Sequence, residues 1–153
     1  MIYEETEMPE YIGPAWVTVQ GGIYLPGADD ERAYVWKLEN GKRVEVISWE
    51  TEIPSAPDIM DGIAVLSYRV DGVRRVEIAD LSGQTIYSGE LFPEGLPGVE
   101  GDPNMFSYAI IGGDADKIIL NLQNITQNEM VDYTVMLDLN NNLKATVLWV
   151  NQG

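Results

Sequence analysis

Oxygen-bearing side chains at alternate positions, Asp138, Asn140 and Asn142, are the first candidates for chemistry in this sequence. The spacing is typical of the start of a calcium-binding loop, in which carboxylate and amide oxygens ligate the ion. The glycine and the distal acidic residue that complete such a loop are missing here. Asn and Asp are also frequent in turns because they accept left-handed backbone conformations. The segment is therefore either a site for Ca²⁺, the only cofactor that the sequence suggests, or an ordinary turn.

Three arginines, Arg69, Arg74 and Arg75, flank the dipeptide Asp71-Gly72. Asp-Gly between two strand-like segments predicts a two-residue hairpin turn, because both turn residues need a positive φ. That register places Arg69 directly opposite Arg74, and like charges in opposed positions are unfavourable. The arginines therefore need either an acidic side chain of the protein or a bound anion nearby. The second alternative makes all three a predicted ligand-binding site.

Four tryptophans and eight tyrosines offer aromatic surface on which a ligand could stack. We predict Trp16 and Trp49 as ligand-binding candidates, with Trp16 the more exposed of the two. Trp36 shares a strand face with Leu38, which indicates a core position. Trp49 shares a face with Ile47 in the same way. Both interpretations of Trp49 stay open, because aromatic residues in strands more often form core and cross-strand pairs than ligand platforms.

No Cys and no His occur among the 153 residues. Their absence excludes disulfides, thiolate nucleophiles, Ser-His and Cys-His catalysis and the usual zinc sites. The 25 acidic residues could supply a carboxylate pair for glycoside hydrolysis, but nothing in the sequence singles out a pair. We therefore predict that the protein is not an enzyme, and a carboxylate-based hydrolase is the least favoured alternative.

The formal net charge is −16, from 25 acidic and 9 basic residues. This charge opposes binding to nucleic acid and to anionic membrane surfaces. No apolar run approaches the length of about 20 residues that a membrane-spanning helix needs. We expect no nucleic-acid partner and no membrane insertion. The expected partner is another protein or a second copy of the chain, as in a homodimer.

The residues named above must be positioned by β-strands. Apolar and polar residues alternate between clusters of Gly, Asn, Asp and Pro, which predicts an all-β fold of about ten antiparallel strands without an amphipathic helix. A hydrophobic content of 45% in 153 residues is sufficient for one core. The strands are predicted at 15–25, 33–39, 42–51, 62–70, 73–79, 84–91, 106–111, 117–125, 132–139 and 143–150.

Three segments repeat the order strand, polar turn, strand: AYVWKLENGKRVEVISWE, RVEIADLSGQTIYSGEL and YTVMLDLNNNLKATVLWV. Each follows another predicted strand, so the repeats cover about 15–52, 57–92 and 104–150. This arrangement resembles the blades of a β-propeller. The resemblance implies a partial β-propeller of three blades, too few for a closed ring unless two chains combine or this is a piece of a longer propeller. An up-and-down barrel or a β-sandwich fits the same strands.

Residues 1–13 are rich in glutamate and predict an extended arm before a single domain at 14–153. The acidic start lacks the basic region of a signal peptide. The compartment stays open, with an extracytoplasmic or cell-envelope location favoured if the chain is an excised domain. The predicted function is a non-catalytic protein-interaction or scaffold module, and a carbohydrate- or small-ligand-binding module is the alternative.

Overall fold

A computed structural model describes residues 11–12, 17–19, 22–50, 55–126 and 128–152. These residues form strands and one 3₁₀ turn, η1 (Pro103–Met105), and none of them lies in an α-helix, which confirms the all-β prediction. They contain thirteen strands rather than about ten. The strands are β1 (Tyr11–Ile12), β2 (Val17–Val19), β3 (Gly22–Ala28), β4 (Arg32–Glu39), β5 (Lys42–Glu50), β6 (Asp58–Met60), β7 (Ile63–Val70), β8 (Val73–Asp80), β9 (Thr85–Glu90), β10 (Ser107–Gly113), β11 (Lys117–Ile125), β12 (Met130–Asp138) and β13 (Lys144–Gln152).

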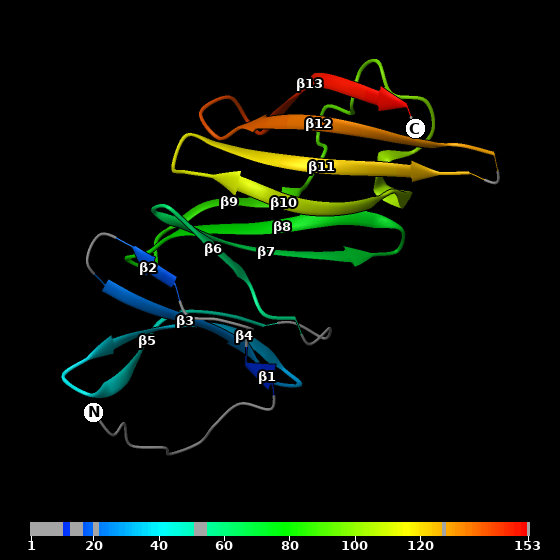
Figure 1. Ribbon diagram of the computed structural model, residues 1–153. Helices are drawn as coiled ribbons and strands as arrows, with labels where there is room; N and C mark the ends of the chain where they lie inside the picture. The colour runs from blue at the N-terminus through cyan, green and yellow to red at the C-terminus, as the bar shows by residue number, and fades with distance from the viewer. Residues whose placement is uncertain (1–10, 13–16, 20–21, 51–54, 127, 153) are drawn as a thin grey trace. The chain divides into compact units, whose positions relative to one another are not determined.

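The strands form three antiparallel sheets that follow one another along the chain (Figure 1). The first contains β3-β4-β5, with β1 and β2 both paired to β3. The second has the order β6-β7-β8-β9 and the third the order β10-β11-β12-β13. Neighbours in each sheet are consecutive in sequence from β3 onward, so each sheet is a meander joined by short connections.

The hairpin turns lie where the dipeptides predicted them. Asn40 and Gly41 have φ values of 52° and 78°, and Asp71 and Gly72 have φ values of 51° and 80°. Two successive residues with positive φ make the type I′ turn, whose twist matches that of the flanking strands. The turn register therefore aligns Val70 with Val73 and Arg69 with Arg74.

The additional strands are short and lie beside longer ones. β1 falls within the predicted arm, where Tyr11 and Ile12 pair with Ala28 and Gly27 of β3. β6 falls between the predicted strands at 42–51 and 62–70, where a connection was expected, and pairs with the start of β7. Both strands pair with backbone groups that an edge strand would otherwise leave unpaired. The rest of the predicted arm lies outside the described residues.

The described residues divide into two compact units, and their boundary passes through β7, β8 and β9. The first unit contains β1–β6, β7 up to Tyr68, and Glu77–Tyr87. Its core joins the β3–β5 sheet to small residues of β7 and β8. Alanines at 64 and 79 let the two backbones approach closely, because their side chains are short. The buried members are Tyr24, Val35, Ile47, Ala64 and Ala79, and Val46, Trp49, Ile59 and Leu81 pack against them.

The second unit contains Arg69–Val76 and the described residues from Ser88 onward. One face of its sheet is apolar, because alternate residues of β11 and β12 are buried. The ring of Phe106 stacks on that of Tyr133 with centroids 6.2 Å apart. The buried apolar residues of this unit are Val76, Leu91, Phe92, Leu96, Phe106, Ile118, Leu120, Leu122, Val131, Tyr133, Val135, Leu137, Leu143 and Ala145. Helices long and apolar enough to cross a membrane do not occur in the described part of the chain.

Candidate binding face on the β10–β13 sheet

The residues predicted to ligate calcium form a hydrogen-bonded turn. The Oδ1 atom of Asp138 accepts a hydrogen bond from the backbone N–H of Asn140 at 2.9 Å. The side-chain amide of Asn140 donates to Oδ1 of Asp116 at 3.1 Å, and Asn142 has a φ of 47°. These contacts are those of an Asx turn, which uses the same oxygens that a metal ion would need. No three acidic side chains of the described residues gather into a group that could hold a metal ion.

The three arginines do not form one cluster. Arg74 and Arg75 are consecutive in β8, so their side chains lie on opposite faces of the hairpin. Arg69 lies opposite Arg74 and shares its face. In the part of the chain that the structure describes, none of the three makes an ion pair with a carboxylate. Among the described residues, the charge of Arg74 is therefore not paired with an acidic side chain.

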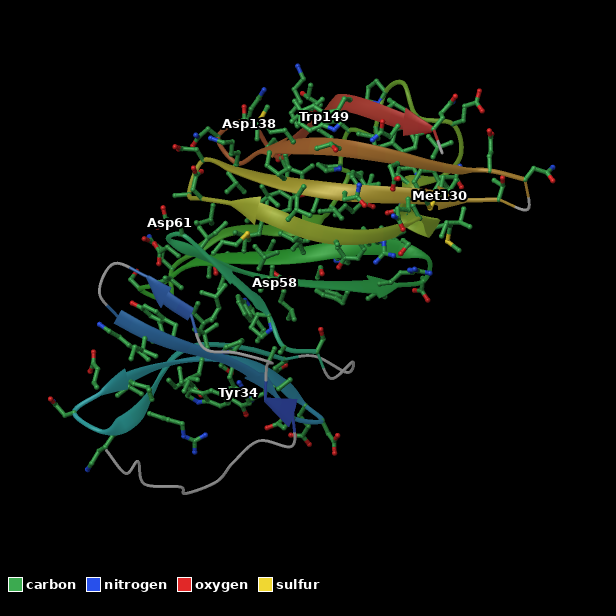
Figure 2. All side chains as sticks on the ribbon, in the orientation of Figure 1. Tyr34, Asp58, Asp61, Met130, Asp138 and Trp149 are labelled. Carbon is green, nitrogen blue, oxygen red and sulfur yellow. The ribbon has the colours of Figure 1, made fainter. Side chains whose placement is uncertain are left out.

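The two predicted aromatic candidates, Trp16 and Trp49, do not form an exposed platform that the structure describes. Trp16 lies outside the described residues, and Trp49 is half-buried against the core of the first unit. Trp36 is buried as predicted, with its ring stacked on Tyr34 at 5.1 Å and the Arg43 guanidinium 5.2 Å from its centroid. The exposed tryptophan is Trp149 on β13, with 60% of its surface accessible (Figure 2).

Sequence reasoning missed Trp149, although a signal was present. Leu148, Trp149 and Val150 are three consecutive apolar residues in a strand. Side chains of a strand alternate between faces, so one face cannot bury all three. All three are in fact exposed on β13, which is the last strand in the order of its sheet.

Trp149 belongs to a face of the sheet that carries polar side chains. Thr134 of β12 pairs with Trp149 and with Asn121 of β11. In the next row Asp132 pairs with Asn151 and with Gln123. Alternation places these residues opposite the buried Leu122, Tyr133 and Val135. We call this surface the polar face and define it by Asn121, Gln123, Asp132, Thr134, Trp149 and Asn151.

The polar face contains an acceptor that is not satisfied. Asp132 Oδ1 is buried and has no hydrogen-bond partner among the described residues. A buried polar atom without a partner costs roughly 1–3 kcal/mol, and more when it is charged. Its row neighbours Gln123 and Asn151 carry amide groups that both donate and accept. The face therefore contains a buried acceptor without a described partner, in the row of hydrogen-bonding side chains next to the exposed ring of Trp149.

The polar face has a counterpart in the β3–β5 sheet. In β5 the register shifts at Val46, which has no partner between the pairs Val35–Ile47 and Trp36–Glu45. In β13 the register shifts in the same way at Leu148, between the pairs Thr134–Trp149 and Val135–Val147. Both shifts are β-bulges in the last strand of a meander. When the two sheets are aligned on their bulges, Thr134 of β12 corresponds to Val35 of β4. Trp149 of β13 then corresponds to Ile47 of β5.

Among the carboxylates of the described residues, Asp58 is the one whose environment favours the neutral form. It begins β6 (Figure 2), and partial desolvation raises its pKa above the ordinary value, although the residue stays exposed. A glycosidase needs two carboxyl groups within roughly 5–10 Å of each other. Within the described ranges, no second acidic group contributes to the pKa of Asp58. The environment of Asp58 therefore does not by itself indicate the carboxylate pair of the hydrolase alternative.

Comparison of the chain with protein-family models, with curated proteins and with solved structures found no match.

Proposed function

We propose that the protein is a non-catalytic binding module made of three blade-like sheets, and that its polar face binds a neutral carbohydrate. The observation that carries the proposal is the exposed Trp149 ring beside the unpaired acceptor of Asp132. An aromatic ring offers a flat apolar surface to the C–H face of a sugar ring. Hydroxyl groups of the same sugar donate to a carboxylate and exchange hydrogen bonds with amides.

The dimensions of the polar face favour a chain of sugars over a single ring. Neighbouring strands lie about 4.8 Å apart, so Trp149 on β13 and Asn121 on β11 are separated by about 10 Å. A chain of sugars therefore contacts both positions at once more readily than a single ring does. The net charge of −16 repels acidic polysaccharides, which is why the proposed ligand is neutral.

The blade-like part of the proposal is supported by the repeated meanders and by the two matching bulges. Each sheet runs through its strands in chain order, as the strands of a propeller blade do. The bulges at Val46 and Leu148 then occupy the same place in the first and third sheets. A closed ring is not part of the proposal, because the polar face lacks the apolar side chains that a dry contact between blades requires.

Affinity gel electrophoresis in xylan, mannan and barley β-glucan tests the carbohydrate proposal. We expect one of these polysaccharides to retard the wild-type protein, and Trp149→Ala to abolish the retardation. Met105→Ala is the matched control, because Met105 belongs to the same unit, is also 60% exposed and lies outside the polar face. No retardation of the wild type in any of the three gels, or equal retardation of Trp149→Ala, would overturn the proposal.

Self-association is the second candidate function, and the charge distribution favours it. All 25 acidic residues lie at or before Asp138, so β13 contains none. Its exposed Leu148, Trp149 and Val150 form an apolar edge that two acidic chains could share without repulsion between carboxylates on that strand. Light scattering on a sizing column separates the candidates. A mass of twice 17.0 kDa that Val150→Lys returns to 17.0 kDa supports self-association, whereas a wild-type monomer excludes it.

A further inference from the structure

Arg74 is a buried cation with an unusual set of neighbours. It lies near the start of β8, only 9% exposed. Its Nη2 donates a hydrogen bond to the backbone carbonyl of Phe106 at 2.7 Å, and its guanidinium lies 4.0 Å from the ring centroid of Tyr108. Its backbone N–H donates to Oδ1 of Asn104 at 3.0 Å. These contacts attach the tip of the β7–β8 hairpin to residues 104–108.

The charge of Arg74 has no counter-ion among these contacts. The Phe106 carbonyl and the Tyr108 side chain, which contacts Arg74 through its ring and through a side-chain hydrogen bond, are neutral, and the Nε–H is buried without an acceptor among the described residues. Buried charges in proteins are usually paired, because an unpaired one loses its hydration without compensation. Burial is the largest influence on the pKa of Arg74 and lowers it. The positive charge of Arg69 lowers the pKa further, whereas Tyr108 raises it.

Arg69 adds a second positive charge on the same face of the hairpin. The Asp71-Gly72 turn places it opposite Arg74, and its side chain is exposed. Two opposed guanidinium groups destabilise a hairpin, and an anion between them would offset the repulsion between their charges. Guanidinium groups donate parallel hydrogen bonds to carboxylate and phosphate oxygens, which makes them the preferred side chains for such anions.

We infer that Arg69 and Arg74 together bind an oxyanion, either a free phosphate or the carboxylate of an acidic peptide. Arg74 is held in place by Phe106 and Tyr108, so little side-chain freedom remains to be lost on binding. Arg69 is the accessible partner and closes on the anion from the solvent side. This site shares no residue with the polar face, so it can fail or succeed independently of the carbohydrate proposal.

Thermal unfolding at constant ionic strength tests the inference. Sodium chloride is replaced stepwise by sodium phosphate in one series and by the sodium salt of tetraglutamate in another. We expect one of these anions to raise the midpoint temperature of the wild type by about 3–6 °C at ten times its dissociation constant. The anion that does so identifies the source of the oxygen ligands, phosphate or peptide carboxylate.

Two variants with the same change of charge give the decisive comparison. Arg69→Gln should remove the anion-dependent rise, whereas Arg75→Gln, on the opposite face of the same hairpin, should retain it. Neither variant removes the anchoring contacts of Arg74, so both should fold. If neither anion raises the wild-type midpoint, or if Arg69→Gln responds as strongly as Arg75→Gln, no oxyanion site exists at this pair.

Discussion

The β3–β5 sheet and the β10–β13 sheet have similar backbones and opposite surfaces. Each ends in a strand with a β-bulge, at Val46 in one and at Leu148 in the other. Around the first bulge the face is apolar and packs against alanines of β7 and β8. Around the second bulge the corresponding face is polar. The positions that correspond are Val35 and Thr134, Ile47 and Trp149, Ala33 and Asp132, Trp49 and Asn151, Pro26 and Asn121, and Ala28 and Gln123.

The difference shows that the backbone arrangement of a sheet does not determine whether its face is buried or exposed. Strand length, turn and bulge determine which residues share a face, and both sheets agree in these features. The side chains at the shared positions then decide whether the face becomes core or stays open. Replacing Ala33 by an acidic counterpart, Asp132, is incompatible with dry packing, because an unpaired carboxylate is costly to bury. The third sheet therefore carries polar side chains at positions where the first sheet is apolar.

The largest loss of stability is expected from a substitution at Gly83, in the turn after β8, because this turn lies against the bulge at Val46. Gly83 has a φ of 96°, and a Cβ atom there would lie 2.7 Å from the carbonyl oxygen of Val46. We expect Gly83→Ala to lower the free energy of unfolding by about 3 kcal/mol, because it combines backbone strain with a collision. Urea denaturation measures the change.

Gly72→Ala is the control for Gly83→Ala. Gly72 has a φ of 80°, and a Cβ atom there would have no heavy atom of the described residues within 4 Å. It should cost only the strain of the left-handed conformation, about 1–2 kcal/mol. Equal losses in the two variants would mean that the bulge at Val46 is not in close contact with the Gly83 turn.

Val35 and Thr134 occupy corresponding positions, and exchanging their residue types should lower the free energy of unfolding by unequal amounts. Val35→Thr places a hydroxyl in a fully buried apolar site and should lower the free energy of unfolding by about 1–3 kcal/mol. Thr134 is also buried, at 8% exposed, but Thr134→Val keeps the shape of the side chain and removes only the hydroxyl, so it should lower the free energy of unfolding by less, about 1 kcal/mol or below. Chemical denaturation of both variants beside the wild type provides the values. A cost at Thr134 as large as that at Val35 would show that the polar face is also a packed interface.

The smallest expected effect concerns Asp58 and depends on pH. Because desolvation raises its folded pKa above the unfolded value of 3.8, its ionised form destabilises the native state. The penalty appears as pH rises through 3.8 and is complete above the folded pKa. Asp58→Asn should therefore raise the midpoint temperature at about pH 7 and leave it unchanged at about pH 3.

Asp61→Asn is the matched control for that experiment, since it removes the same charge from an exposed turn next to β6. Any stabilisation that comes only from lowering the net negative charge should appear equally in both variants. A midpoint shift that is the same for Asp58→Asn and Asp61→Asn at neutral pH would rule out a specific desolvation of Asp58.

Local features of the fold were predictable from the sequence. The dipeptides Asn40-Gly41 and Asp71-Gly72 specify their turns because only a few residue types accept a positive φ. The same turn predicted the opposition of Arg69 and Arg74 from neighbouring residues alone. The number of strands was underestimated, because short strands such as β1 and β6 form by pairing to an existing edge.

The polar face was not predictable, because it depends on pairings between strands. A bulge at Leu148 moves every later residue of β13 by one position relative to β12, so alternation along the sequence misplaces Trp149. Trp49 shares a strand face with Ile47, and this alternation predicted a core position. The contacts of Trp49 with the core cluster of the first unit agree with that prediction. The calcium motif at Asp138 is the reverse case, in which spacing alone did not distinguish a metal site from a hydrogen-bonded turn.

The most direct test of the account follows the tryptophan indole N–H signals by NMR, as a soluble oligosaccharide of the polysaccharide that retards the protein is added. The signal that disappears in Trp149→Phe belongs to Trp149 on the polar face. The signal that disappears in Trp49→Phe belongs to Trp49, which packs against the core of the first unit. We predict that the Trp149 signal shifts with saturation and that the Trp49 signal does not move, because Trp49 packs against the core cluster. Saturable movement of Trp49 with Trp149 unchanged would contradict the assignment of the polar face as the binding surface.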